Sequence, residues 1–233
     1  MRATNWEFTN RALVFGLIFA LGFFLYRVDH QTSTAALARW LGSGLGMDPN
    51  LVGRVLFGCA AFLLLVAAFI RTWASSYLHA NVVYAPELKT TLLIADGPYR
   101  QVRNPLYLAN VLMAVGMGAL MSRTGFVVAI AAMVGFSYRL ILREEIELQA
   151  SQGEPYVRYL RAVPRLWPSP RPRVASSGRQ ARWRDGFQAE SWFWGFAVAV
   201  ATFTITLNLT LLFVILAASL VLFWVSSAVR QTK

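Results

Sequence analysis

The sequence predicts an all-α fold, a polytopic membrane helical bundle of about six membrane helices with a small cytoplasmic region. Hydrophobic residues make up 57% of the 233 residues and charged residues only 14%, whereas soluble domains carry about 25% charged residues. The apolar residues gather in long blocks, and most arginines lie between these blocks. Both patterns are typical of a multi-pass membrane protein.

Each apolar block is close to the length that crosses a bilayer as a helix. About 20 residues span a hydrocarbon core of about 30 Å, and backbone groups in lipid must be hydrogen-bonded internally, which favours helices. Two pairs of blocks are separated only by short stretches, near Arg123 and near Asn208, and are expected to form helical hairpins. The predicted spans are 11–28, 51–70, 106–121, 125–142, 191–207 and 209–229.

The placement of arginine predicts the topology. Loops rich in Lys and Arg remain in the cytoplasm, and the segment 139–184 is rich in arginine. Counting spans from this segment places 71–105 and both termini in the cytoplasm and 29–50 outside. The 22 Lys and Arg against 11 Asp and Glu give a net charge of +11. Cytoplasmic loops explain this excess, so nucleic-acid binding is not predicted.

The chain divides into three predicted regions. Residues 1–173 form the membrane core, which carries the polar motifs at about 71–168. Residues 174–190 form a basic linker that contains Gly and Ser. Residues 191–233 form a C-terminal membrane hairpin, and because it has few ionisable groups we expect it to pack or anchor and not to catalyse.

The stretch DGPYRQVRNPLYLAN lies directly before a predicted span. Gly97 and Pro98 predict a turn, which can bring backbone N–H groups close to a ligand. Asn104 suits the N-cap of the following helix and Pro105 suits its first turn. A helix N-terminus attracts anions. Arg103 either strengthens that attraction or extends to lipid phosphates.

A second polar stretch, REEIELQASQGEPYVRY, follows the fourth apolar block. Glu144 and Glu145 are either a solvated helix face or acceptors for a cation or for the hydroxyl groups of a ribose. The Gly-Glu-Pro sequence at Gly153 predicts a turn. Tyr156 and Tyr159 are three residues apart, which places them on one face of a short helix.

Some kinds of chemistry have no motif in this sequence. Its one cysteine, Cys59, lies in an apolar block, and the spacing of its two histidines fits no metal site. His30 is expected outside, and His79 is expected to be structural. The chain also carries no nucleophile–base motif and no phosphate-binding loop. The remaining possibilities are ligand binding and a reaction that depends on the position and charge of groups in the site.

In order and spacing, GPYRQVRNPLYLAN, a membrane hairpin and REEIELQASQGEPYVRYLRAVPRLWP resemble the isoprenylcysteine carboxyl methyltransferase and phospholipid methyltransferase superfamily. Its members show Gly-Pro-Tyr-Arg, then Arg-His-Pro-x-Tyr, a Glu-Glu pair and Gly-x-x-Tyr-x-x-Tyr. The resemblance covers about residues 71–168. It implies an integral membrane methyltransferase whose cofactor, S-adenosylmethionine, is held on the cytoplasmic face without a Rossmann fold.

The resemblance also implies the residues of the site. Arg103 and Glu144 take the catalytic roles, and Glu144 and Glu145 hold the ribose or the cationic end of the cofactor. The acceptor is a lipid-like or small apolar molecule, methylated on N, O or S. The implied cofactor-binding residues are Gly97, Pro98, Tyr99, Arg103, Asn104, Pro105, Tyr107, Glu144, Glu145, Tyr156 and Tyr159.

One position departs from the superfamily, because Asn104 stands where His is usual. Asn forms hydrogen bonds but does not titrate near neutral pH. Methyl transfer from a sulfonium depends on alignment more than on a base, so activity is expected to be retained. Two alternatives stay open: an NADPH-dependent membrane reductase of the sterol-reductase type, and a non-catalytic membrane protein that retains the scaffold.

Overall fold

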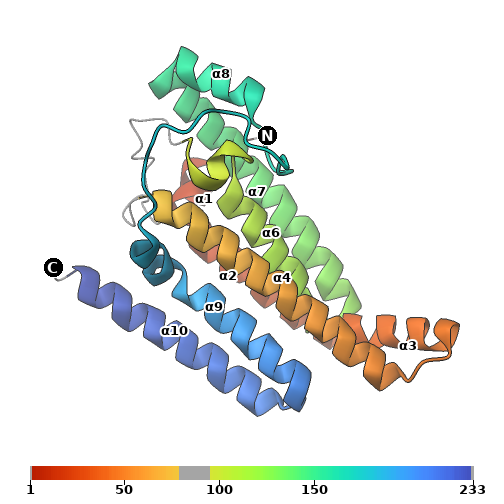
Figure 1. Ribbon diagram of the computed structural model, residues 1–233. Coiled ribbons are helices and arrows are strands. Elements are labelled where there is room, and N and C mark those ends of the chain that lie inside the picture. The colour runs from red at the N-terminus through yellow and green to blue at the C-terminus, as the bar shows by residue number, and fades with distance from the viewer. Residues whose placement is uncertain (1, 79–94, 232–233) are drawn as a thin grey trace. The chain divides into compact units, whose positions relative to one another are not determined.

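The computed structural model of the protein describes residues 2–78 and 95–231. Within these ranges the chain forms helices and no strand, which confirms the predicted all-α class (Figure 1). An isolated bridge joins Thr32 and Ser122. The prediction made for His79, and that part of the predicted cytoplasmic segment 71–105 which covers 79–94, fall outside the described residues.

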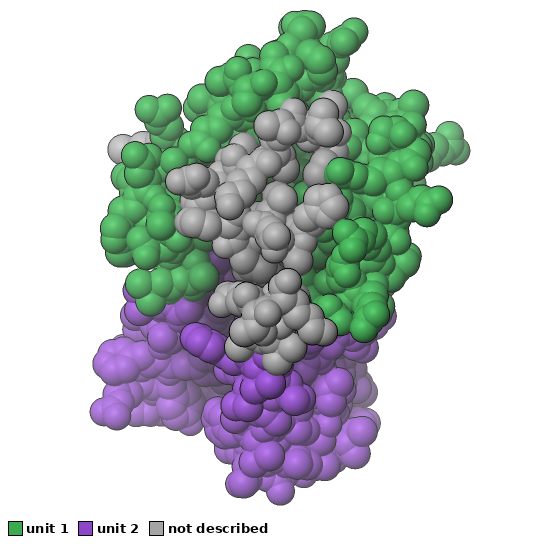
Figure 2. All heavy atoms as spheres, turned by 90° about the vertical axis from the view of Figure 1, so that its left-hand side faces the viewer, with its two compact units in different colours: residues 1–14, 69–110, 134–190 green, residues 15–68, 111–133, 191–233 purple. Residues whose placement is uncertain are grey.

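The chain forms two compact units, coloured separately in Figure 2. Unit 1 contains Met1–Val14, Phe69–Asn110 and Val134–Glu190, and unit 2 contains Phe15–Ala68, Val111–Met133 and Ser191–Lys233. Several helices contribute residues to both units, so the units do not follow sequence order. The three predicted regions of the chain stay predictions.

Among the described residues, two helices are long and apolar enough to cross a membrane: α4 (Pro49–Tyr77) and α7 (Arg123–Gln152). At a rise of 1.5 Å per residue each is about 44 Å long, which exceeds a hydrocarbon core of about 30 Å. Shorter apolar helices are α6 (Pro105–Gly118) and the Leu209–Val225 part of α10 (Leu209–Gln231). The six-span topology and the orientation stay predictions.

The first part of unit 2 is tied to the turn between α6 and α7. Helix α2 (Arg11–Phe24) continues into the short η1 (Leu25–Arg27), and α3 (Ser33–Leu45) follows. The Ser33 N–H donates to the Met121 carbonyl at 2.8 Å, and Arg123 forms an ion pair with Asp29 at 3.0 Å.

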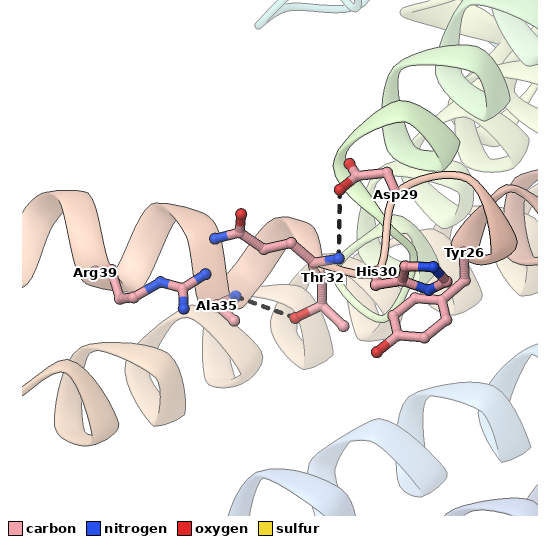
Figure 3. A pocket seen from close by; sticks show the side chains of 7 residues that line it. Tyr26, Asp29, His30, Thr32, Ala35 and Arg39 are labelled. Carbon is pink, nitrogen blue, oxygen red and sulfur yellow. Dashed lines mark hydrogen bonds between the residues drawn. The ribbon is translucent and has the colours of Figure 1, made fainter.

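A pocket of about 440 Å³ lies at this junction (Figure 3). It is lined by Tyr26, Asp29, His30, Gln31, Thr32, Ala35 and Arg39.

The end of unit 2 is a helical hairpin, as the sequence predicts. Helix α9 (Trp183–Thr206) ends just before α10 begins, and the Asn208 side chain caps α10 by accepting from the Leu211 N–H at 3.0 Å. Arg54 of α4 donates to the Thr204 and Ile205 carbonyls at 3.0 and 2.8 Å. These two bonds satisfy carbonyls that the end of a helix leaves unpaired.

Unit 1 contains three short elements, α1 (Asn5–Thr9), η2 (Gly97–Arg100) and α8 (Glu154–Ala162), of which η2 and α8 carry motif residues. Gly153 precedes α8 with φ +63°, a conformation that favours glycine, so the predicted turn and short helix are both present. Tyr156, Tyr159 and Val163 form a buried cluster on one face of α8 and at its end. This cluster fixes α8 within unit 1.

Candidate active site

The Gly-Pro-Tyr turn is built around a glycine that nothing else can replace without strain. Gly97 has φ +57°, and a Cβ at this position would overlap the Tyr77 ring. Tyr99 is buried; its N–H donates to the Asp96 carbonyl at 3.2 Å and its carbonyl accepts from the Tyr159 hydroxyl at 2.8 Å. The turn therefore has a fixed position, with both backbone groups of Tyr99 bonded inside unit 1.

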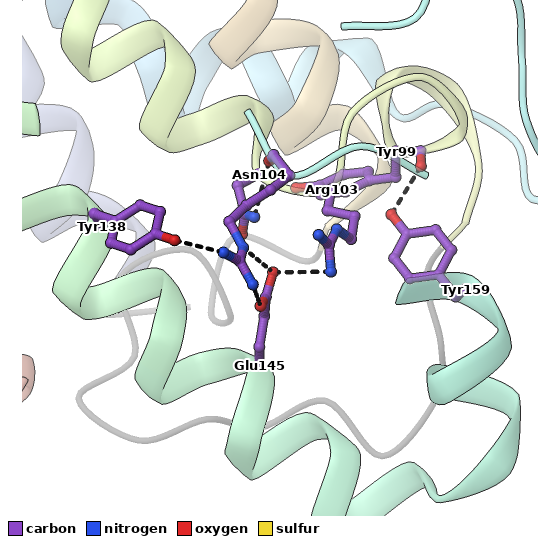
Figure 4. Close-up of polar contacts among 7 residues, drawn as sticks. Tyr99, Arg103, Asn104, Tyr138, Glu145 and Tyr159 are labelled. Carbon is purple, nitrogen blue, oxygen red and sulfur yellow. Dashed lines mark hydrogen bonds and ion pairs between the residues drawn. The ribbon is translucent and has the colours of Figure 1, made fainter. Parts of the chain in front are cut away.

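Glu145 lies between two arginines. Its Oε1 is 3.1 Å from Arg103 Nη1, and both of its oxygens accept from Arg165, at 3.1 and 2.8 Å (Figure 4). Arg165 also donates to the Tyr138 hydroxyl at 2.7 Å. The Glu145 side chain is only 9% exposed, and a buried carboxylate needs such partners. Glu145 thus joins the two motif segments.

Asn104 holds the segment that follows α8. Its Nδ2 donates to the Arg165 carbonyl at 3.0 Å, and the Arg103 N–H donates to the Pro164 carbonyl at 2.9 Å. Pro105 begins α6 directly after Asn104, so the predicted helix start is confirmed. The side-chain amide of Asn104 reaches the returning chain, a role that a helix-cap pattern in the sequence does not reveal.

Tyr107 and Glu144 form a second polar pair. The Tyr107 hydroxyl donates to Glu144 Oε1 at 2.6 Å, across from α6 to α7. Glu144 is half-buried, and Tyr107 is buried. Neighbouring residues on a helix point in different directions, so Glu144 and Glu145 contact different partners. Their predicted roles in cofactor binding stay predictions.

Arg103 offers a donor that no described residue uses. Its Nε is buried and has no hydrogen-bond partner in the described part of the chain, while its Nη1 contacts Glu145. Buried polar groups are normally hydrogen-bonded. An unpaired guanidinium N–H is thus a position where a ligand carboxylate or carbonyl oxygen can bind.

Tyr156 and Tyr159 are buried in unit 1, at 4% and 5% exposure. Burial raises the pKa of both hydroxyls, so both stay protonated at neutral pH. The Tyr159 hydroxyl supports the Gly-Pro-Tyr turn through the Tyr99 carbonyl. Both tyrosines can act as neutral donors or packing groups, and neither can act as a base.

A strap of chain, residues 163–182, runs back across the motif turn. The Ser169 N–H donates to the Gln101 carbonyl at 2.9 Å. Asp96 is buried and accepts from the Ser176 hydroxyl at 2.5 Å and from the N–H and hydroxyl of Ser177. Burial raises the pKa of Asp96, but these hydrogen bonds outweigh burial and lower it. Asp96 therefore fastens the strap as a charged group.

Several of these contacts lie outside the residues that the sequence predicts for the site. Asp96 and Arg165 lie in the two motif stretches but have no role assigned from sequence, and Tyr138 lies outside both stretches. A buried pair of Arg71 and Glu190 lies further along unit 1. In the sequence, Arg71 and Glu190 are marked only by being charged residues next to an apolar block. Their pairing across 119 residues has no sequence signature.

Comparison with known proteins agrees with the motifs. Residues 54–151 match the family model described as phospholipid methyltransferase. This match confirms the resemblance found in the sequence and supports a membrane methyltransferase in general terms. No solved structure matches the chain.

Two curated relatives bear names that refer to metal resistance. The chain is 27% identical to the cobalt-zinc-cadmium resistance protein CzcN of Cupriavidus metallidurans over 157 residues, which are 66% of this chain and 69% of that protein. It is 25% identical to the nickel-cobalt-cadmium resistance protein NccN of Alcaligenes xylosoxydans over 121 residues. That second match covers 52% of this chain and 54% of the relative.

Proposed function

We propose that the protein is an integral membrane methyltransferase that transfers a methyl group from S-adenosylmethionine to a lipid-like or small apolar acceptor. One observation carries this proposal. The polar side chains of two motifs far apart in the sequence meet as Tyr107 with Glu144 and as Arg103 with Glu145. They lie within the segment that matches the family model.

The residues present fit the groups of this cofactor. Its methionine part carries a carboxylate and an ammonium group, and its ribose carries two hydroxyls. Arg103 provides the unpaired Nε for a carboxylate. The Tyr107 hydroxyl donates a hydrogen bond to Glu144 Oε1, whereas Glu144 Oε2 accepts no hydrogen bond from the described residues. That oxygen can accept from an ammonium or a hydroxyl group.

Each residue then has a definite part. Arg103 and Glu144 bind the cofactor, Glu145 and Arg165 orient Arg103, and Asn104 holds the strap against the start of α6. When bound, S-adenosylmethionine supplies a methyl group on a positively charged sulfur. Transfer requires the acceptor atom in line with that methyl, so the chain contributes position and charge.

The remaining predicted residues line the same region. Gly97, Pro98 and Tyr99 form the turn, Pro105 begins the helix, and Tyr156 and Tyr159 pack behind the turn. A polar cofactor arrives from the cytoplasm and an apolar acceptor from the bilayer. A site at the cytoplasmic end of the membrane helices is open to both, and we place it there.

Calorimetry on the detergent-purified protein tests the proposal. We expect binding of S-adenosylmethionine and of S-adenosylhomocysteine, and about tenfold weaker S-adenosylmethionine binding in Glu144→Gln and Arg103→Gln, because a hydrogen bond to a charged group exceeds a neutral one by about 1–1.5 kcal/mol. Glu147→Gln is the matched control. Glu147 lies one turn along α7, is 36% exposed and pairs with Arg143, so this variant should bind normally.

Three outcomes overturn or replace the proposal. Folded protein that binds neither methyl compound contradicts it. Binding of NADPH in the same assay indicates the reductase. Binding of the methyl donor without turnover on any lipid extract indicates a non-catalytic protein.

Mass spectrometry addresses the acceptor. Lipids from cells with and without the gene, fed a methyl-labelled donor, should differ in one labelled species. The names of the two relatives suggest growth in cobalt, zinc or cadmium as the accompanying cellular assay.

A further inference from the structure

A buried polar cluster lies in unit 1 outside the predicted site. Arg71 of α4 contacts both carboxylate oxygens of Glu190, at 2.5 and 3.1 Å, and its Nη1 donates to Asn110 Oδ1 at 2.7 Å. The Ser75 hydroxyl also donates to Glu190, at 2.7 Å. Arg71 is 6% exposed and Glu190 is fully buried. We name these four residues the buried staple, because they join α4, α6 and α9.

Helix α9 fits closely against α4 at this point. Glu190 has non-helical backbone angles, φ −111° and ψ 15°, which mark a kink in α9. One turn earlier, a Cβ on Gly186 would lie 2.5 Å from the Thr72 carbonyl oxygen, so only glycine allows this approach. The Arg182 N–H donates to the Ser76 carbonyl at 2.8 Å. The first turns of α9 are therefore docked on α4.

We propose that the buried staple positions α6, and with it Tyr107 and Glu144. Asn110 lies three residues after Tyr107, on the same face of α6. Arg71 donates to Asn110, and the Tyr107 hydroxyl donates to Glu144, so both contacts involve this face of α6. Arg71, Asn110 and Glu190 are thus positioning residues. This inference rests on the proposed function, since Glu144 is the residue positioned.

The electrostatic surroundings agree with this geometry. Burial raises the pKa of Tyr99, and the charges of Glu190 and Arg71 act on it in opposite directions. The staple is therefore close to the motif turn as well as to α6. Glu190 lies beyond the segment 54–151 that matches the family model. We therefore assign the first turns of α9 to the functional core, although the sequence predicts residues 174–190 as a linker.

The chemistry of buried ion pairs allows stability and positioning to be separated. Removing one partner leaves a buried charge uncompensated, whereas replacing both partners by apolar residues is often neutral. Glu190→Leu leaves Arg71 without its carboxylate. The double change Arg71→Leu with Glu190→Leu removes both charges and also removes the contact with Asn110. Asn110→Ala removes only that contact and keeps the ion pair.

The test combines three measurements on the full chain: melting temperature, hydrogen exchange of the α6 segment and the Kd for S-adenosylhomocysteine. We expect Glu190→Leu to melt well below the double variant. Asn110→Ala and the double variant should both melt above Glu190→Leu, exchange faster in the first turns of α6 and bind about tenfold more weakly. Asn50→Ala, an exposed change on α4, should alter none of the three.

Each result decides one question. If Glu190→Leu melts like the wild type, the staple does not exist. If Asn110→Ala and the double variant keep wild-type exchange in α6 and wild-type Kd, the staple is structural only and the positioning role is wrong. If the wild type itself does not bind, the proposed function fails, while melting and exchange still decide whether the staple holds α6.

Discussion

Replacing Arg165 by Met should destabilise the protein by about 2 kcal/mol, and the structure gives the reason. The change removes two hydrogen bonds to Glu145, at 3.1 and 2.8 Å, and one to Tyr138 at 2.7 Å. Hydrogen bonds to charged groups contribute about 1.5–3 kcal/mol each. Arg165 is 33% exposed, which screens part of this, and Arg103 still neutralises Glu145.

The same argument predicts a non-additive pair. Arg103→Met alone leaves Glu145 with Arg165, so its cost should be similar. Removing both arginines leaves a buried carboxylate with no cation, a situation that costs about 3–5 kcal/mol in addition to the lost hydrogen bonds. The double variant should therefore lose more stability than the sum of the two single variants.

Thermal unfolding in detergent measures this, since 1 kcal/mol shifts the melting temperature by about 2–4 °C for a chain of this size. Arg165→Met should melt about 4–8 °C below the wild type. Arg158→Met, an exposed arginine on α8, is the control and should melt normally. Strict additivity of the two single variants would refute the idea that the arginines share one buried charge.

Three further changes test other parts of the fold. Gly97→Ala should lower the melting temperature by several degrees, because φ +57° and the Tyr77 ring exclude a Cβ, and adding Tyr77→Ala should restore only part of the loss. Asp96→Asn should release the strap, so trypsin should cleave at the arginines of the strap faster than in the wild type. Cleavage of this variant at the wild-type rate would show that Asp96 does not hold the strap. The Arg123 hydrogen bond lowers the pKa of Asp29 from 3.8 to about 2. A carboxyl group whose pKa is lowered in the folded state stabilises the fold at pH values above its unfolded pKa, and this stabilisation is lost as the pH falls toward 2. The melting temperature of Asp29→Asn should therefore depend less on pH between about pH 4 and 2 than that of the wild type.

Local features of this fold could be predicted from sequence because their causes are local. The turn at Gly97, the helix start at Pro105 and the helix after Gly153 depend on backbone angles that Gly and Pro determine. The hairpin turn near Asn208 is signalled by a break between two apolar blocks. Each of these elements is present where the pattern places it.

The contacts that connect these elements could not be predicted in the same way. Arg165 meets Glu145 across 20 residues, and Asp96 meets Ser177 across 81. The partner of each charged residue depends on how the helices pack, and a single sequence does not reveal that packing. The ends of the helices could not be predicted either, because composition marks an apolar block but not the full helix that contains it. Helices α4 and α7 extend past their apolar blocks, and α6 ends before its block does.

The buried staple also bears on how the chain is made. Arg71 leaves the ribosome 119 residues before Glu190, and at about 5–20 residues per second this interval lasts about 6–24 s. During that time the guanidinium of Arg71 cannot form its ion pair with Glu190. Docking of α9 is therefore a late step of biogenesis, and the chain reaches its final arrangement only when nearly all of it has been synthesised.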